Sequence, residues 1–176
     1  MQADLRKNYF ELFGLAAAFD IDPADLAARY RDLARRLHPD KFAARPDPER
    51  RLSLQLTARL NEAFQVLKDP IRRGRYLLSL RGVDLGEETD TAMDPAFLME
   101  QMELREALAQ ARGCADPRTR LAELANDIQR RLAAKLHTLA AQLQQDRSSE
   151  ARATLREMQF LERSRREIDN LEEELA

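Results

Sequence analysis

Apolar residues recur every three to four positions along most of the chain, which is the spacing of one face of an α-helix. No stretch alternates apolar and polar residues as a strand does, so the sequence predicts an all-α fold. Asp-Pro pairs occur five times, and each predicts a helix start, because Asp caps helices and Pro suits the first helical position. Gly14, Gly82 and Gly113 fall where helices are expected to end. The predicted helices cover residues 5–13, 23–37, 48–68, 71–80, 95–112, 117–145 and 149–175.

The helices at 23–37 and 48–68 are predicted to form an antiparallel hairpin, because a short connection joins two helices of similar length. Residues 82–94 are polar and acidic without a helical stripe, which predicts a linker. We therefore expect an N-terminal domain over residues 1–81 and a C-terminal three-helix bundle over residues 95–176. The expected core stripes of the hairpin are Leu26, Tyr30, Leu33 and Leu37 on its first helix and Leu52, Leu56, Leu60, Phe64 and Leu67 on its second. In the bundle, helix 117–145 carries the stripe Leu121, Leu124, Ile128, Leu132, Leu136, Leu139 and Leu143.

A His-Pro-Asp sequence connects the two hairpin helices. Pro39 disfavours helical dihedrals at His38 and has no N–H to donate, so the first helix should end near Leu37. His38 and Asp40 are then left on a turn at the tip of the hairpin with their side chains free. Such a turn can be an ordinary connection between helices or a contact site for a partner, and a short motif by itself does not decide between them.

Basic residues surround this turn. At about 100° per residue, Arg31 and Arg35 lie opposite the core stripe of their helix, and two further arginines flank the stripe. This face is either a solvated helix surface or a surface that steers the chain toward an acidic partner. A nucleic-acid partner is not expected, because no aromatic residues are interleaved with the charges and the net charge is −2. The predicted basic face comprises Arg29, Arg31, Arg35, Arg36 and Lys41.

The helix predicted at 95–112 has apolar residues on two sides. Leu98, Met99 and Met102 lie about 100–200° around the helix from Phe97, so they cannot share its core face. Either this helix is buried on both sides or these residues form an exposed patch. Exposure is favoured, because a three-helix bundle has little to cover a second side. The core stripe on this helix is predicted to be Phe97, Leu104, Leu108 and Ala111.

The side chains around these apolar residues favour a binding surface. Methionine is flexible and suits surfaces that adapt to a partner. Glu103 and Glu106 border the three apolar residues on the same helix. Phe160 lies off the stripe of its own helix and is predicted to join the exposed surface.

The residues that chemistry would need are scarce. Cys114 is the only cysteine, which excludes an internal disulfide framework and a multi-cysteine zinc site. His38 and His137 are the only histidines, and no phosphate-binding glycine loop is present. We therefore expect no metal, no cofactor and no enzymatic activity. The chain opens without a signal peptide and no apolar run approaches the roughly 18 residues of a membrane span, so a cytoplasmic location without a membrane partner is expected.

Several segments together resemble a known family. YFELFGL at residues 9–15, the His-Pro-Asp turn and NEAFQVL at residues 61–67 are similar to a J domain. YLLSL at 76–80, AFLMEQMELRE at 96–106 and the Phe-Leu pair at 160–161 resemble the HscB family of J-domain co-chaperones. The resemblance extends from about residue 9 to the end. The cysteine-containing metal module of some relatives and the glycine-rich and Cys-x-x-Cys regions of general DnaJ proteins are absent from this sequence.

The resemblance implies two binding surfaces. The J domain would dock on a DnaK/HscA-type chaperone and stimulate its ATPase, and the C-terminal domain would bind an IscU-type scaffold of iron–sulfur cluster assembly. Alternatives are a J-domain protein with another client, or a structural helical assembly protein with no ATPase partner. The implied chaperone-binding residues are His38, Pro39, Asp40, Lys41, Arg29, Arg31, Arg35 and Arg36, and the implied scaffold-binding residues are Leu98, Met99, Met102, Glu103, Glu106 and Phe160.

Overall fold

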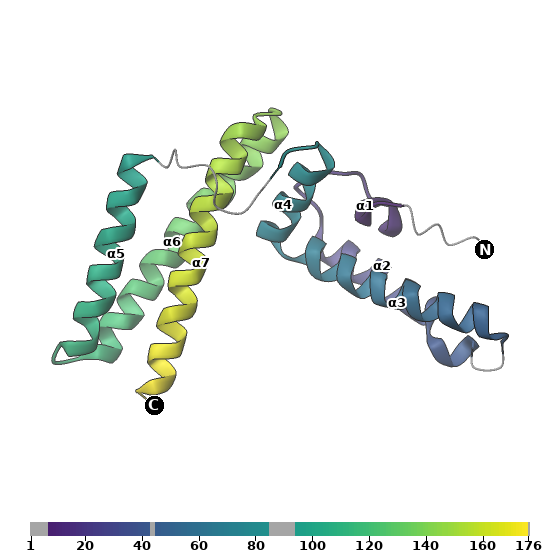
Figure 1. Ribbon diagram of the computed structural model, residues 1–176, viewed down its shortest axis with the longest axis horizontal. Coiled ribbons are helices and arrows are strands. Elements are labelled where there is room, and N and C mark those ends of the chain that lie inside the picture. The colour runs from purple at the N-terminus through teal and green to yellow at the C-terminus, as the bar shows by residue number, and fades with distance from the viewer. Residues whose placement is uncertain (1–6, 43–44, 85–93, 176) are drawn as a thin grey trace. The chain divides into compact units, whose positions relative to one another are not determined.

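A computed structural model describes residues 7–42, 45–84 and 94–175, and these form helices and no strand. The chain divides into two compact units, Met1–Arg81 and Gly82–Ala176 (Figure 1). The predicted all-α class is therefore confirmed for the described part. The helices of the first unit are α1 (Tyr9–Phe13), α2 (Pro23–Leu37), the short 3-10 helix η1 (Pro39–Phe42), α3 (Asp47–Lys68) and α4 (Pro70–Leu80). Those of the second are α5 (Pro95–Gly113), α6 (Pro117–Gln144) and α7 (Ser148–Glu174).

The first unit is built around the hairpin of α2 and α3, and α1 and α4 also pack on α3. The turn between α2 and α3 carries η1 at one tip of this hairpin (Figure 1). Aromatic rings tie the elements together, since Tyr9 of α1 stacks on Tyr76 of α4 with ring centroids 4.4 Å apart. Tyr30 of α2 stacks in the same way on Phe64 of α3, at 4.2 Å. The largest fully buried side chains of the unit are Phe10, Leu26, Leu60, Leu67 and Leu78.

The prediction that Leu52 of α3 is a core residue is wrong. Leu52 is 38% exposed, whereas the adjacent Ser53 is only 2% exposed. The Ser53 hydroxyl donates a 2.9 Å hydrogen bond to the carbonyl of Leu37 at the end of α2. Burial of a polar side chain is tolerated where it has such a partner, so the rotation of α3 places Ser53 inward and Leu52 at the surface.

A buried arginine joins three parts of the first unit. Arg73 of α4 is 8% exposed, and its guanidinium donates to the carbonyl of Leu67 and lies 5.0 Å from the ring centroid of Phe19. Burial lowers the pKa of Arg73 from its ordinary value, and the nearby carboxylates of Asp20 and Asp69 act in the opposite direction. The arginine therefore links the segment before α2 to the end of α3 and to α4.

The second unit is a bundle of α5, α6 and α7, as predicted, in which α6 and α7 run side by side (Figure 1). A buried hydrogen bond, in which the Thr154 hydroxyl donates to Gln142 (2.9 Å), joins α6 to α7. Leu132 and Leu136 of the predicted α6 stripe are only half-buried. The apolar residues shared by the three helices are Leu104, Leu108, Ala111, Leu121, Leu124, Ala125, Ile128, Leu161, Ile168 and Leu171.

Most helix boundaries agree with the sequence predictions. α2 begins and ends at the predicted residues, whereas α1 begins only at Tyr9, because the Asn8 side chain caps it there. Residues 5 and 6 of the predicted first helix and residues 85–93 of the predicted linker lie outside the described residues. Gly14 ends α1 and Gly82 follows α4 with positive φ, whereas Gly113 is the last residue of α5 itself.

All five Asp-Pro pairs lie at the start of a helix as predicted, and in four of them the Asp side chain caps that helix. The Asp69 side chain, for example, accepts hydrogen bonds from the N–H groups of Ile71 and Arg72. Asp47 differs, because it is already the first residue of α3 and Pro46 occupies the cap position without a side-chain bond. The four capping residues are Asp22, Asp69, Asp94 and Asp116.

This difference gives a matched pair of substitutions. Asp69→Ala is expected to lower the free energy of unfolding by about 1 kcal/mol, because two N–H groups at the start of α4 lose their acceptor. Asp47→Ala removes an exposed carboxylate that does not cap a helix, so the free energy of unfolding should change by less than about 0.5 kcal/mol. Urea unfolding followed by circular dichroism measures both. Equal losses would show that the cap at Asp69 contributes nothing specific.

Candidate functional site

The His-Pro-Asp turn begins where α2 stops. Backbone dihedrals leave the helical region at His38 (φ −54°, ψ 127°), so the predicted helix end at Leu37 is confirmed. The following residues form η1, in which the Lys41 N–H donates to the carbonyl of His38 (3.0 Å). The turn predicted at the tip of the hairpin is thus a defined 3-10 segment.

The side chains of His38 and Asp40 face solvent and each other. Their exposed fractions are 57% for His38 and 89% for Asp40, and His38 Nδ1 lies 3.4 Å from Asp40 Oδ2. The Asp40 N–H also lies within hydrogen-bond distance of His38 Nδ1 (3.3 Å). The turn can therefore offer a partner an N–H donor and a carboxylate that accepts from cations.

Four of the five predicted basic residues are exposed near this turn. Arg31 and Arg35 lie on the outer side of α2, where Arg35 Nε donates to the Arg31 carbonyl (3.3 Å). Arg36 is exposed and forms an ion pair with Asp32 on the same helix (2.8 Å). Lys41 is exposed within the turn itself. From here on, the basic face means Arg31, Arg35, Arg36 and Lys41.

The fifth predicted basic residue, Arg29, has a structural position. Its Nε pairs with Asp25 (2.9 Å), and its Nη1 donates to the carbonyls of Phe13 and Gly14, both at 3.0 Å. Carbonyls at the end of a helix have no partner within the helix, and Arg29 supplies donors where α1 ends. Its guanidinium is engaged within the unit, so Arg29 is left out of the basic face defined above, and its role in chaperone binding stays a prediction.

The second unit carries an apolar surface on α5. Leu98 is 44% exposed, Met99 64% and Met102 71%, so the predicted exposure of these three residues is confirmed. We call them the apolar patch. Glu103 and Glu106 are exposed on the same helix, and Glu106 accepts a hydrogen bond from Gln110 (3.2 Å). Large apolar side chains that face water together are typical of sites where another molecule binds.

Phe160 does not lie fully on this exposed surface. Its ring is half-buried and packs against the shared core of the bundle. It meets the ring of Phe97 edge-on, with centroids 5.7 Å apart and an interplanar angle of 88°. The expectation of an exposed Phe160 is therefore wrong in part, because its ring reaches from α7 to the core side of α5.

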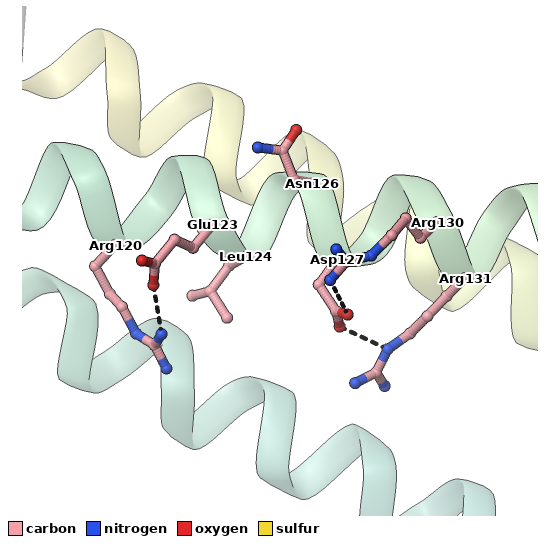
Figure 2. A pocket seen from close by; sticks show the side chains of 7 residues that line it. All are labelled: Arg120, Glu123, Leu124, Asn126, Asp127, Arg130 and Arg131. Atoms are coloured by element: carbon pink, nitrogen blue, oxygen red, sulfur yellow. Dashed lines mark hydrogen bonds and ion pairs between the residues drawn. The ribbon is translucent and has the colours of Figure 1, made fainter.

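A depression of about 590 Å³ lies along α6. Figure 2 shows that all its lining residues come from α6 and that its charged groups are paired. Arg120 pairs with Glu123 (2.8 Å), and Asp127 pairs with both Arg130 (3.1 Å) and Arg131 (2.7 Å). These arginines already have carboxylate partners, so the depression is poorly suited to hold an anion. The lining residues are Arg120, Glu123, Leu124, Asn126, Asp127, Arg130 and Arg131.

Two residues beside the turn were missed by sequence reasoning. Ser53 and Thr57 of α3 both donate hydroxyl hydrogen bonds to the carbonyl of Leu37, the residue before His38. Their sequence signature is two hydroxyl residues four positions apart next to an apolar stripe, which places both on one side of the helix.

Within the described ranges, no group of three or more His, Cys, Asp or Glu side chains could hold a metal ion. None of the helices in the described part is both long and apolar enough to pass through a bilayer.

Comparisons with known proteins cover both units. The family model described as the DnaJ domain matches residues 4–76, and the one described as the HSCB C-terminal oligomerisation domain matches residues 93–169. A "Co-chaperone protein HscB homolog" from Shewanella sp. strain MR-4 is 46% identical over 171 residues, which are 96% of this chain and 98% of that protein.

Solved structures agree with these matches. Chaperone HscB from Vibrio cholerae has a TM-score of 0.86 and 39% identity, with 97% of this chain and 100% of that chain covered. The human co-chaperone protein HscB has a TM-score of 0.90 and 31% identity, with 96% and 84% covered. The family models span both units and the relatives align with nearly the whole chain, so this chain belongs to the HscB family of J-domain co-chaperones.

Proposed function

We propose that this chain is an adaptor of iron–sulfur cluster assembly: it binds an IscU-type scaffold protein, delivers it to an HscA-type chaperone of the DnaK class, and stimulates the ATPase of that chaperone. Any catalysis then belongs to the chaperone. The observation that carries the proposal is the presence, in one chain, of an exposed His-Pro-Asp turn in the first unit and an exposed apolar patch in the second.

The chemistry of the turn supports docking on the chaperone. The Asp40 carboxylate is 89% exposed, so it can accept hydrogen bonds from a cationic group of the chaperone without breaking contacts of its own fold. The basic face follows along α2 and η1 and complements an acidic partner. Arg31 and Arg35 contribute most to this complementarity, because Arg36 is already paired with Asp32.

The chemistry of the apolar patch supports binding of the scaffold. Leu98, Met99 and Met102 expose apolar surface whose removal from water favours association. Glu103 and Glu106 supply charges around it that can fix the register of a partner. Phe160 is half-buried and contacts Phe97. It therefore stabilises the position of α5, which carries the apolar patch, and offers the exposed part of its ring to the scaffold.

A two-part measurement tests the proposal. The full chain is added to purified HscA-type chaperone, and ATP hydrolysis is followed with and without IscU-type scaffold; stimulation by the chain and a further increase with scaffold are expected. Stimulation without any binding to the scaffold, measured by titration calorimetry, would indicate a J-domain protein with another client. Absence of stimulation would contradict the proposal altogether.

The encounter with the chaperone should depend on salt. If Arg31 and Arg35 steer it, the association rate of the parent should fall as ionic strength rises, because the Debye length shrinks from about 10 Å at 0.1 M to about 3 Å at 1 M. Arg31→Ala/Arg35→Ala should associate about tenfold more slowly at low salt and lose most of this dependence. Stopped-flow fluorescence measures both rates. Identical salt dependence in parent and variant would remove these arginines from the mechanism.

A further inference from the structure

The end of α2 requires hydrogen-bond donors from elsewhere. In a continuing helix, the N–H of Lys41 would donate to the carbonyl of Leu37, four residues earlier. Here the Lys41 N–H donates to the carbonyl of His38 instead, because the chain turns into η1. Leu37 is 5% exposed, and a buried carbonyl that loses its partner is costly.

α3 supplies the donors. Ser53 Oγ lies 2.9 Å and Thr57 Oγ1 lies 3.2 Å from the Leu37 carbonyl oxygen, and each hydroxyl donates to it. The two residues are four positions apart, so both face the end of α2. Ser53 is 2% exposed and Thr57 is half-buried, so water competes little for these bonds.

The anchored carbonyl is covalently next to the His-Pro-Asp turn. His38 and Asp40 are mostly exposed and contact each other, so their own side chains do little to fix where the turn lies. We propose that Ser53 and Thr57 are positioning residues for this turn: by holding the Leu37 carbonyl, their hydroxyls set the orientation in which His38 and Asp40 meet the chaperone. The effect on chaperone binding rests on the proposed function, whereas the hydrogen bonds to the Leu37 carbonyl do not.

Two substitutions of Thr57 separate positioning from packing. Thr57→Val removes the hydroxyl and keeps the volume, whereas Thr57→Ser keeps the hydroxyl and removes a methyl group. With purified HscA-type chaperone, we expect Thr57→Val to raise the concentration needed for half-maximal ATPase stimulation about fivefold, and Thr57→Ser to leave it nearly unchanged. Ser53→Ala/Thr57→Val should have a larger effect. A packing role predicts the reverse order for the two single variants.

A second measurement uses the full chain alone. Amide hydrogen exchange at Asp40 and Lys41 should be faster in Thr57→Val than in the parent, and unchanged in Thr57→Ser. Ile71→Val is the control, because it trims a buried side chain of α4 in the same unit and does not remove a bond at the turn. If the double variant fails to fold, the single Thr57→Val variant still tests whether the hydroxyl positions the turn.

The outcomes distinguish this inference from the proposed function. Unchanged exchange at the turn in Thr57→Val overturns the positioning role, whatever the chaperone does. Faster exchange together with an Asp40→Asn variant that stimulates as well as the parent overturns the docking role of the turn, whereas absence of stimulation by the parent chain contradicts the proposed function. Faster exchange and weaker stimulation in Thr57→Val, together with retained stimulation in Thr57→Ser, support both the positioning role of Thr57 and the docking role of the turn.

Discussion

Asp40→Asn is expected to abolish most ATPase stimulation while the chain stays folded. The substitution removes the charge and keeps the shape, and the backbone N–H of residue 40 can still donate to His38 Nδ1. A hydrogen bond to a charged group contributes about 1.5–3 kcal/mol, so stimulation at a fixed concentration should fall about tenfold or more. The Asp40 side chain is 89% exposed, so the free energy of unfolding should change by less than about 0.5 kcal/mol.

A second variant and a control make this test specific. His38→Gln should also lose stimulation without loss of stability, since His38 is 57% exposed. Asp47→Asn is the charge control, because it neutralises an exposed carboxylate at the start of α3 that pairs only at 3.4 Å with Arg50. The measurement is steady-state ATP hydrolysis by HscA-type chaperone, with thermal melts of each variant. A well-folded Asp40→Asn variant with full stimulation would remove the turn from the docking mechanism.

The parts of the fold that local chemistry decides were predictable from the sequence. α2 begins at an Asp-Pro pair whose carboxylate caps the helix, and ends where Pro39 prevents its continuation. The position of the apolar patch followed from helix angles, because Leu98 and Met102 could not share a face with Phe97 on a regular helix. Its exposure followed from the small size of a three-helix bundle, which has little to cover a second side of α5. The ends of a helix and the angular positions of its side chains thus depend on residues that are close together in the sequence.

The errors arose where tertiary contacts choose between adjacent positions. Leu52 and Ser53 differ by one helix position, and the choice between them depended on a carbonyl of α2 that needed a donor. The contacts of Arg29 were likewise not predictable from its own helix, because its guanidinium donates to the carbonyls at the end of α1. Phe160 lies off the stripe of its helix, but its ring contacts Phe97 on another helix and is therefore half-buried. Helical periodicity predicts the direction in which a side chain points, but not the groups of other helices that it contacts.

The same distinction determines how the apolar patch should be tested. Phe160 contacts the core, so a variant that includes it would confuse loss of binding with loss of stability. Phe160→Ala alone is expected to lower the melting temperature, because it removes the edge-on contact with Phe97 and leaves space beside the core. Leu175→Ala, in contrast, changes a leucine of the same unit that is 40% exposed, close to the 44% of Leu98, and should have little effect on stability or binding.

Leu98→Ala/Met99→Ala/Met102→Ala is therefore expected to keep its fold and lose the scaffold. These side chains are 44%, 64% and 71% exposed, so truncation opens no core cavity. Truncation of a central interface residue costs about 2 kcal/mol or more, which raises the dissociation constant for IscU-type scaffold at least about 30-fold. Stimulation of the chaperone in the absence of scaffold should match the parent, because the turn is untouched. Titration calorimetry, thermal melts and the ATPase assay measure the three quantities. A melting temperature far below the parent would mean that the patch is core, and an unchanged affinity in a folded variant would mean that the scaffold binds elsewhere.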